Sequence, residues 1–203
     1  MKKVSLLLLA SISISISTLA QDAIQTSLKT ATEQYNQKKL LDAQSSLNKA
    51  VNDINTEIGL QVIAALPKTA GDLTADGESD TNGQPGSDPS CSAVNVTREY
   101  SNIQGDRSIL LNISQNFTTA NNIKGAINQT TTSTEDGTLQ KIVMLGNFKA
   151  LLVWDIEANE GDIQTAKGNV FIIFSSNGFS SADTFASDVA KIDFTKALEV
   201  FGQ

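Results

Sequence analysis

The side chains best suited to chemistry in this chain are carboxylates, and they gather in two acidic segments. The first runs from Asp72 to Gly83, and it places oxygen-bearing side chains at alternate positions around Gly77: Asp72, Thr74, Asp76, Glu78 and Asp80. This is the spacing of a calcium-binding loop, in which oxygens wrap a hard cation and the glycine permits a sharp turn. The twelfth position, where such a loop needs a bidentate glutamate, is Gly83. We therefore expect a solvated acidic loop, and we assign no metal ligand.

The second acidic group follows Trp154 and could act in acid–base chemistry. It comprises Asp155, Glu157, Glu160 and Asp162. Paired carboxylates hydrolyse glycosidic bonds when they flank a substrate cleft. In a tight hairpin, however, such residues keep the turn soluble and discourage edge-to-edge pairing of sheets. We expect the second role, with Trp154 in the core because of the large area that tryptophan buries, and we predict no catalytic residue.

The composition excludes several other kinds of site. The chain has no histidine, which removes Ser-His-Asp and Cys-His activation of a nucleophile and zinc sites built on histidine. Its single cysteine, Cys91, cannot form an internal disulfide. We expect Cys91 to be a small residue entering a strand; the alternative is an intermolecular disulfide or a redox-sensitive thiol. No cofactor is predicted, and a formal charge of −7 without a basic patch argues against nucleic acid as a partner.

Residues 1–20 have the pattern of a secretory signal peptide. Lys2 and Lys3 precede an apolar run, and small residues lead to an expected cut before Gln21. The alternative is a membrane anchor, but the apolar run is far shorter than the roughly 20 residues that a spanning helix needs. A lipoprotein signal would place a cysteine at the cut. We expect a periplasmic or secreted protein of 183 residues (203 minus 20) with a charge of −9, since the two lysines are lost.

Two segments precede the region of predicted strands. Residues 21–66 show apolar side chains at helical spacing in two phases, separated by the polar stretch 36–39, and Pro67 ends the second phase. This pattern predicts a helical hairpin. Residues 67–92 are acidic and nearly devoid of apolar side chains, which predicts a flexible loop.

From residue 93 to 203 the apolar period changes to two, which indicates strands. About six strands are expected, near residues 93–100, 107–113, 140–145, 148–155, 162–167 and 169–175. The fourth and sixth of these are apolar on both faces, so they should be central and covered on both sides. We predict an α+β fold in which the helical hairpin covers one face of a mostly antiparallel sheet and C-terminal helices cover the other, packed as one domain in an α/β/α sandwich.

Four short motifs carry a resemblance to known proteins. They are Ala-Leu-Pro at 65–67, Thr-Arg-Glu-Tyr at 97–100, Gly-Asn-Phe-Lys-Ala at 146–150 and Lys-Ile-Asp-Phe at 191–194. With this layout the chain resembles an uncharacterised group of secreted bacterial α+β proteins, and its sheet and closing helix are similar to the PsbP-like fold of extrinsic photosystem proteins. The resemblance implies a non-catalytic binding or accessory role and supplies no catalytic residue.

These observations favour an exported, non-catalytic binding or accessory protein of the bacterial cell envelope. Its partner would be an unknown envelope protein or a small ligand, without nucleic acid and without stable membrane insertion. Two alternatives stay open. One is a carboxylate-dependent hydrolase, and the other is a carrier of an apolar ligand, which would need a closed apolar cavity of at least roughly 300 Å³ between hairpin and sheet.

Overall fold

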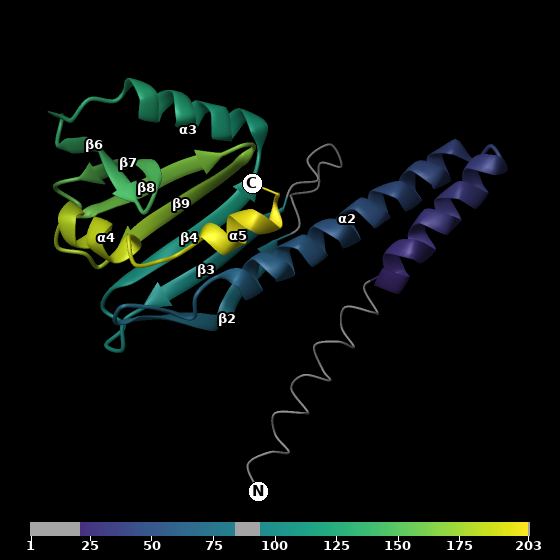
Figure 1. Ribbon diagram of the computed structural model, residues 1–203, viewed down its shortest axis with the longest axis horizontal. Helices are drawn as coiled ribbons and strands as arrows, with labels where there is room; N and C mark the ends of the chain where they lie inside the picture. The colour runs from purple at the N-terminus through teal and green to yellow at the C-terminus, as the bar shows by residue number, and fades with distance from the viewer. Residues whose placement is uncertain (1–20, 84–93, 203) are drawn as a thin grey trace, which may run out of the picture. The chain divides into compact units, whose positions relative to one another are not determined.

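A computed structural model describes residues 21–83 and 94–202 (Figure 1). The chain forms two compact units. Of the described residues, 21–57 form the hairpin unit, and 58–83 with 94–202 form the sheet unit. The expected signal peptide of residues 1–20 and the lone Cys91 lie outside the described residues.

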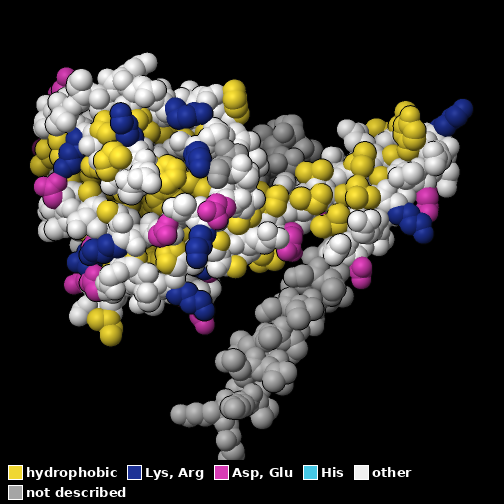
Figure 2. All heavy atoms as spheres, viewed as in Figure 1, with side chains coloured by type: hydrophobic (Ala, Val, Ile, Leu, Met, Phe, Trp, Pro, Cys, Tyr) yellow, Lys and Arg dark blue, Asp and Glu magenta, His cyan; other side chains and the backbone are white. Residues whose placement is uncertain are grey.

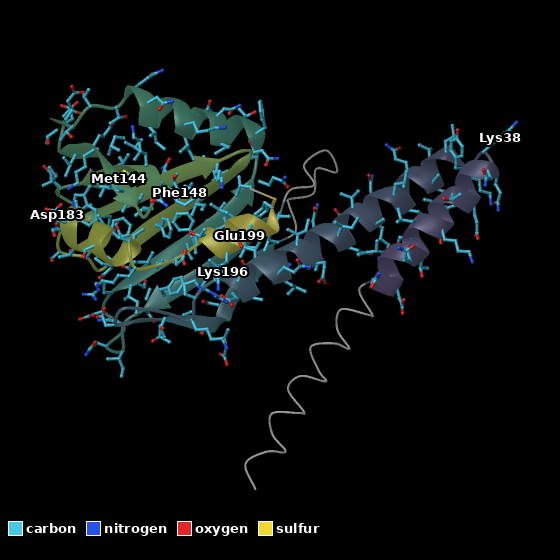
Figure 3. All side chains as sticks on the ribbon, viewed as in Figure 1. Lys38, Met144, Phe148, Asp183, Lys196 and Glu199 are labelled. Atoms are coloured by element: carbon cyan, nitrogen blue, oxygen red, sulfur yellow. The ribbon has the colours of Figure 1, made fainter. Side chains whose placement is uncertain are left out.

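The hairpin unit contains the predicted pair of helices. The first covers residues 21–36, and the second, α2, runs from Leu40 to Ala65, so that its last residues belong to the sheet unit. The backbone reverses direction at Lys38, which adopts a positive φ of 61° and lies at the tip of the hairpin (Figure 3). Small side chains are buried in this unit: Ser27, Ala31, Ala43 and Ala50. Such residues let two helices approach closely, and a hydrogen bond from Ser46 Oγ to Gln34 Oε1 (2.8 Å) joins them.

The sheet unit is built on nine antiparallel strands. They are β1 (Thr69–Ala70), β2 (Leu73–Gly83), β3 (Asn95–Ser101), β4 (Ser108–Gln115), β5 (Ser133–Glu135), β6 (Thr138–Leu145), β7 (Phe148–Asp155), β8 (Glu160–Lys167) and β9 (Val170–Asn177). Their order in the open sheet is β1-β2-β3-β4-β9-β8-β7-β6-β5. Two meanders, β1–β4 and β5–β9, therefore meet along the β4–β9 seam.

Two hairpins of the second meander turn as their Gly-Asn pairs predict. Leu145 pairs with Phe148 across one turn, and Lys167 pairs with Val170 across the other. The first turn residue has a positive φ in both cases, 59° at Gly146 and 58° at Gly168. Glycine at the first central position is the requirement of a type II′ turn, whose twist matches that of the flanking strands.

The prediction of an α+β fold with an N-terminal helical hairpin is confirmed, but the expected number of about six strands is wrong. All six expected strands exist, and three more join them. The segment 67–92, expected to be a flexible loop, supplies β1 and β2, and residues 133–135 supply β5. β2 is hard to recognise because it is largely exposed and its register with β3 shifts between Asp76 and Thr81, which breaks the simple alternation of a strand.

The two central strands are covered on both faces, as predicted, although one cover differs from the expectation. α4 (Ala182–Val189), α5 (Thr195–Val200) and the end of α2 pack on one face, where Phe185 lies 5.9 Å from the ring of the buried Trp154. The other face carries α3 (Phe117–Gln129), which the prediction did not include as a cover (Figure 1). Ile123 and Ile127 of α3 pack there with Leu151 of β7. The core position expected for Trp154 is confirmed.

Candidate functional site

The acidic segment of residues 72–83 does not gather its carboxylates around one point. Asp80 binds Arg98, Asp72 Oδ2 lies 2.7 Å from Arg107 Nη2, and Asp76 Oδ1 accepts the backbone N–H of Glu78. These partners lie on different elements. Throughout residues 21–83 and 94–202, no three Asp, Glu, Cys or His side chains group closely enough to hold a metal ion.

The Arg98–Asp80 pair instead closes the end of α2. The guanidinium binds the carboxylate through Nε (2.8 Å) and Nη2 (2.6 Å), and its Nη1 donates to the carbonyl of Leu66 at 3.1 Å. Tyr100 donates its hydroxyl proton to the carbonyl of Pro67 at 2.9 Å. Leu66 and Pro67 follow the last residue of α2, where the helix offers no backbone donors to their carbonyls. Arg98 and Tyr100 therefore satisfy two acceptors at the helix end. Hydrogen bonding to Asp80 raises the pKa of Arg98.

The second acidic group caps a turn. Asp155 Oδ1 accepts the backbone N–H groups of Glu157 and Ala158, each at 2.9 Å, and Asp155 pairs with Glu160 across the β7–β8 hairpin. Asp155, Glu157 and Glu160 are all exposed. None of the four carboxylates lines either of the two hollows described next.

The larger hollow, of about 570 Å³, lies in the sheet unit where the β6–β7 turn meets the connection between α4 and α5. Its lining comprises Leu145, Gly146, Asn147, Phe148, Lys167, Ala190, Ile192, Asp193, Phe194 and Thr195. Two of the sequence motifs noted above, at 146–150 and 191–194, therefore come together here although they are far apart in the chain. Only the tertiary structure shows that they share a site.

Aromatic side chains and two opposite charges give this hollow its chemistry. The rings of Phe148 and Phe194 lie 5.1 Å apart, and the ammonium of Lys167 stands 5.9 Å from the centre of the Phe148 ring. Phe148 is on β7, beside the helix that carries Lys196 and Glu199 in Figure 3. Asp193 Oδ1 accepts the N–H of Thr195 at 2.9 Å, and the hydrogen bonds from Thr195 lower the pKa of this carboxyl. The hollow thus combines an apolar floor with a cation and a carboxylate.

A smaller hollow of about 330 Å³ shares Asn147 and Phe148 with the larger one. It adds Lys124 from α3 and Lys149 from β7 to its lining. Lys124 donates to the carbonyl of Gly168 at 2.8 Å, and the Thr165 hydroxyl donates to the carbonyl of Lys149 at 2.9 Å. Within the described part of the chain no salt bridge involves Lys124, Lys149 or Lys167. Among the described residues, three lysines that form no salt bridge therefore lie around the β6–β7 turn of an acidic protein.

Comparison with protein-family models, with curated proteins and with solved structures gives no match for this chain. Among the helices within residues 21–83 and 94–202, none has a stretch long and apolar enough to cross a membrane.

Proposed function

We propose that the chain is a non-catalytic binding protein of the bacterial cell envelope, and that it holds a small ligand with an aromatic body and an anionic group at the β6–β7 turn. The observation that carries this proposal is the larger hollow, in which Lys167 stands over Phe148 beside Phe194. Its volume lies in the range of small-molecule sites, which are typically apolar with a few placed polar groups.

The charge pattern favours an anion over a neutral or cationic ligand. Within residues 21–83 and 94–202 Lys167 forms no salt bridge, and Lys124 and Lys149 add to the positive potential around Asn147. A charge-assisted hydrogen bond to a phosphate or carboxylate contributes roughly 1.5–3 kcal/mol, which is more than a neutral bond contributes. The carboxylate of Asp193 and the hydroxyl of Thr195 complete the rim and offer an acceptor and a donor to the remaining polar atoms of a ligand.

The lining of both hollows argues for binding without catalysis and against an apolar cargo. The only carboxylate in the larger lining, Asp193, is engaged by the backbone of Thr195, and no second carboxylate faces it there as glycoside hydrolysis would require. Each lining also includes at least one lysine and an asparagine, which a purely apolar ligand would leave without partners.

Phenyl phosphate is a suitable first probe, with inorganic phosphate and phenol as its two halves. In amide NMR titrations we expect phenyl phosphate to shift resonances of residues 145–148 and 192–195, and to bind at least about tenfold more tightly than either half, because both the charge and the ring are then used. Lys167→Gln should weaken phenyl phosphate binding about tenfold. Lys196→Gln is the matched control, since Lys196 lies on α5 outside the lining.

Equal binding of phenyl phosphate and inorganic phosphate would contradict the role of the aromatic floor. An equal loss of affinity for phenyl phosphate in Lys167→Gln and Lys196→Gln would contradict the placement of the site. The location is tested separately: in an envelope fraction we expect an N-terminus at Gln21, and a protein that retains Met1 there would overturn the exported assignment.

A further inference from the structure

The hairpin unit exposes a row of apolar side chains that its own packing does not use. Leu40, Leu47 and Ile54 repeat at intervals of seven residues on α2, and they are 62%, 49% and 39% exposed. Val51, next to this row on the helix surface, is 40% exposed. Figure 2 shows hydrophobic side chains gathered along this helix. A heptad repeat of large apolar residues is the pattern by which one helix packs along another.

The row is distinct from the surface that holds the hairpin together. Ala43 and Ala50 are the fully buried positions on this part of α2, and each is offset by three residues from Leu40 and Leu47 respectively. An offset of three residues turns the side chain by about 60° around the helix axis, so the alanines and the leucines form neighbouring stripes. The alanine stripe is buried. Leu40, Leu47 and Ile54, which we call the leucine stripe, are exposed.

We propose that the leucine stripe binds a second copy of this chain, with the two α2 helices antiparallel about Leu47. In this arrangement Leu47 lies on the twofold axis, and Leu40 packs against Ile54 of the partner subunit. The spacing makes the stripe self-complementary, because its members lie seven residues on either side of Leu47. A twofold interface requires this property, because the same surface of both copies meets: if residue i of one copy contacts residue j of the other, then j also contacts i.

The charges beside the stripe favour the antiparallel orientation. Lys39 precedes Leu40 and Asp53 precedes Ile54, so each occupies the same flanking position of the heptad with opposite charge. Antiparallel packing brings Lys39 of one copy close to Asp53 of the partner subunit. The twofold symmetry forms this pair twice. Asp53 already contacts Lys49 at 2.8 Å, but its side chain is 29% exposed and its carboxylate can accept from a second cation. Flanking charges of this kind determine partner and orientation in helical pairs.

The available area indicates a reversible dimer. The exposed parts of the stripe, together with those of Val51 on α2 and of Leu28 and Tyr35 on the first helix of the same hairpin, amount to an order of 500 Å² per copy. That is about 1,000 Å² for a symmetric pair, which is near the lower limit for a specific interface. We therefore expect association in the micromolar range. This proposal concerns the hairpin unit and does not depend on the ligand hollow of the sheet unit.

Sedimentation velocity over protein concentrations from about 1 µM to 500 µM tests the proposal, because that range brackets a micromolar dimer. We expect a monomer–dimer equilibrium. Leu47→Glu should weaken dimerisation at least about hundredfold, since it places two carboxylates on the axis. Leu41→Glu is the matched control: Leu41 is 81% exposed, but it points about 100° away from Leu40, so the equilibrium should stay unchanged. Circular dichroism of both variants verifies that the helices persist.

A charge exchange distinguishes a second copy from any other occupant. Lys39→Glu should weaken the dimer, and the double variant Lys39→Glu/Asp53→Lys should restore it, because only a homodimer regains both pairs. A protein that stays monomeric throughout the concentration range would overturn the proposal. So would a dimer that persists in Leu47→Glu, or a stripe that binds phosphatidylethanolamine–phosphatidylglycerol vesicles while the protein shows no self-association.

Discussion

Replacing Arg98 by methionine tests how the sheet unit holds the end of α2. Methionine keeps most of the length of the side chain but removes every donor. Asp80 then keeps a buried charge without a partner, since its side chain is only 12% exposed, and the carbonyl of Leu66 loses its 3.1 Å hydrogen bond. Breaking a buried ion pair by removing one partner typically costs 3–5 kcal/mol. We expect Arg98→Met to lower the free energy of unfolding by about 4 kcal/mol, the middle of this range, because the pair is bidentate and the hydrogen bond to the Leu66 carbonyl is lost as well.

The assay is urea unfolding followed by the fluorescence of Trp154. This is the chain's only tryptophan and it is buried in the same unit, so the signal reports on the sheet unit alone. The midpoint should fall while the slope stays constant, which identifies a change in stability without a change in the surface exposed on unfolding. A decrease of less than about 1 kcal/mol in the free energy of unfolding would refute the reasoning, since a change of that size is typical of an exposed ion pair.

A double-mutant cycle separates two free energies: the cost of leaving one buried charge without its partner, and the net contribution of the ion pair to stability. Asp80→Leu alone leaves the buried guanidinium without its carboxylate, so it should also destabilise. In Arg98→Met/Asp80→Leu neither charge remains, and replacing a whole buried pair by apolar residues is often close to neutral. We therefore expect the double variant to be more stable than Arg98→Met by at least about 2 kcal/mol. Simple additivity of the two losses would contradict this account.

Two further predictions concern the same unit. Gly178 has a φ of 74°, and an added Cβ would lie 1.9 Å from the carbonyl oxygen of Asp106, whereas Gly137 has a φ of 76° with no atom within 4 Å of that position. In urea unfolding, Gly137→Ala should lower the free energy of unfolding by about 1 kcal/mol, from backbone strain alone, and Gly178→Ala should lower it by about 3 kcal/mol. Equal decreases in the two variants would contradict the predicted clash. Burial raises the pKa of Tyr100. Because the folded pKa then lies above the unfolded value of about 10, the corresponding stability is complete below pH ~10 and is lost as the pH rises through the folded pKa. In Tyr35→Phe, which leaves Tyr100 as the only tyrosine, the tyrosinate absorbance should appear above that pH, and a normal midpoint would contradict the effect of burial.

The parts of the fold that the sequence predicts are those where local pattern and burial agree. Apart from the short β5, the strands from Asn95 to Asn177 alternate or are continuously apolar, and Gly-Asn pairs mark two of their turns, so their positions could be predicted within a few residues. β2 could not be found in this way. Only one side of it contributes to the core, mainly through Leu73. Asp80 on β2 pairs with Arg98, and Asp72, just before β2, pairs with Arg107; both arginines are distant in the sequence.

The candidate site was hidden for a related reason. Phe148, Lys167 and Asp193 lie in three separate segments, and each is locally unremarkable: a residue after a turn, the last residue of a strand, and a residue before a short helix. Their proximity results from the β6–β7 turn meeting the chain between α4 and α5. No local spacing encodes this contact.

The seam between the two meanders has a consequence for how the sheet unit folds. β4 pairs with β9 over eight positions, from Ser108 with Asn177 to Gln115 with Val170, whereas every other strand pair of the described sheet joins strands that are consecutive in the chain. Closing a long loop is slow because the entropy is lost before the contacts form. We expect each meander to assemble on its own and the seam to close late, so that Phe174 and Leu111, opposite each other on the seam, would be protected from the solvent only in the final step of folding.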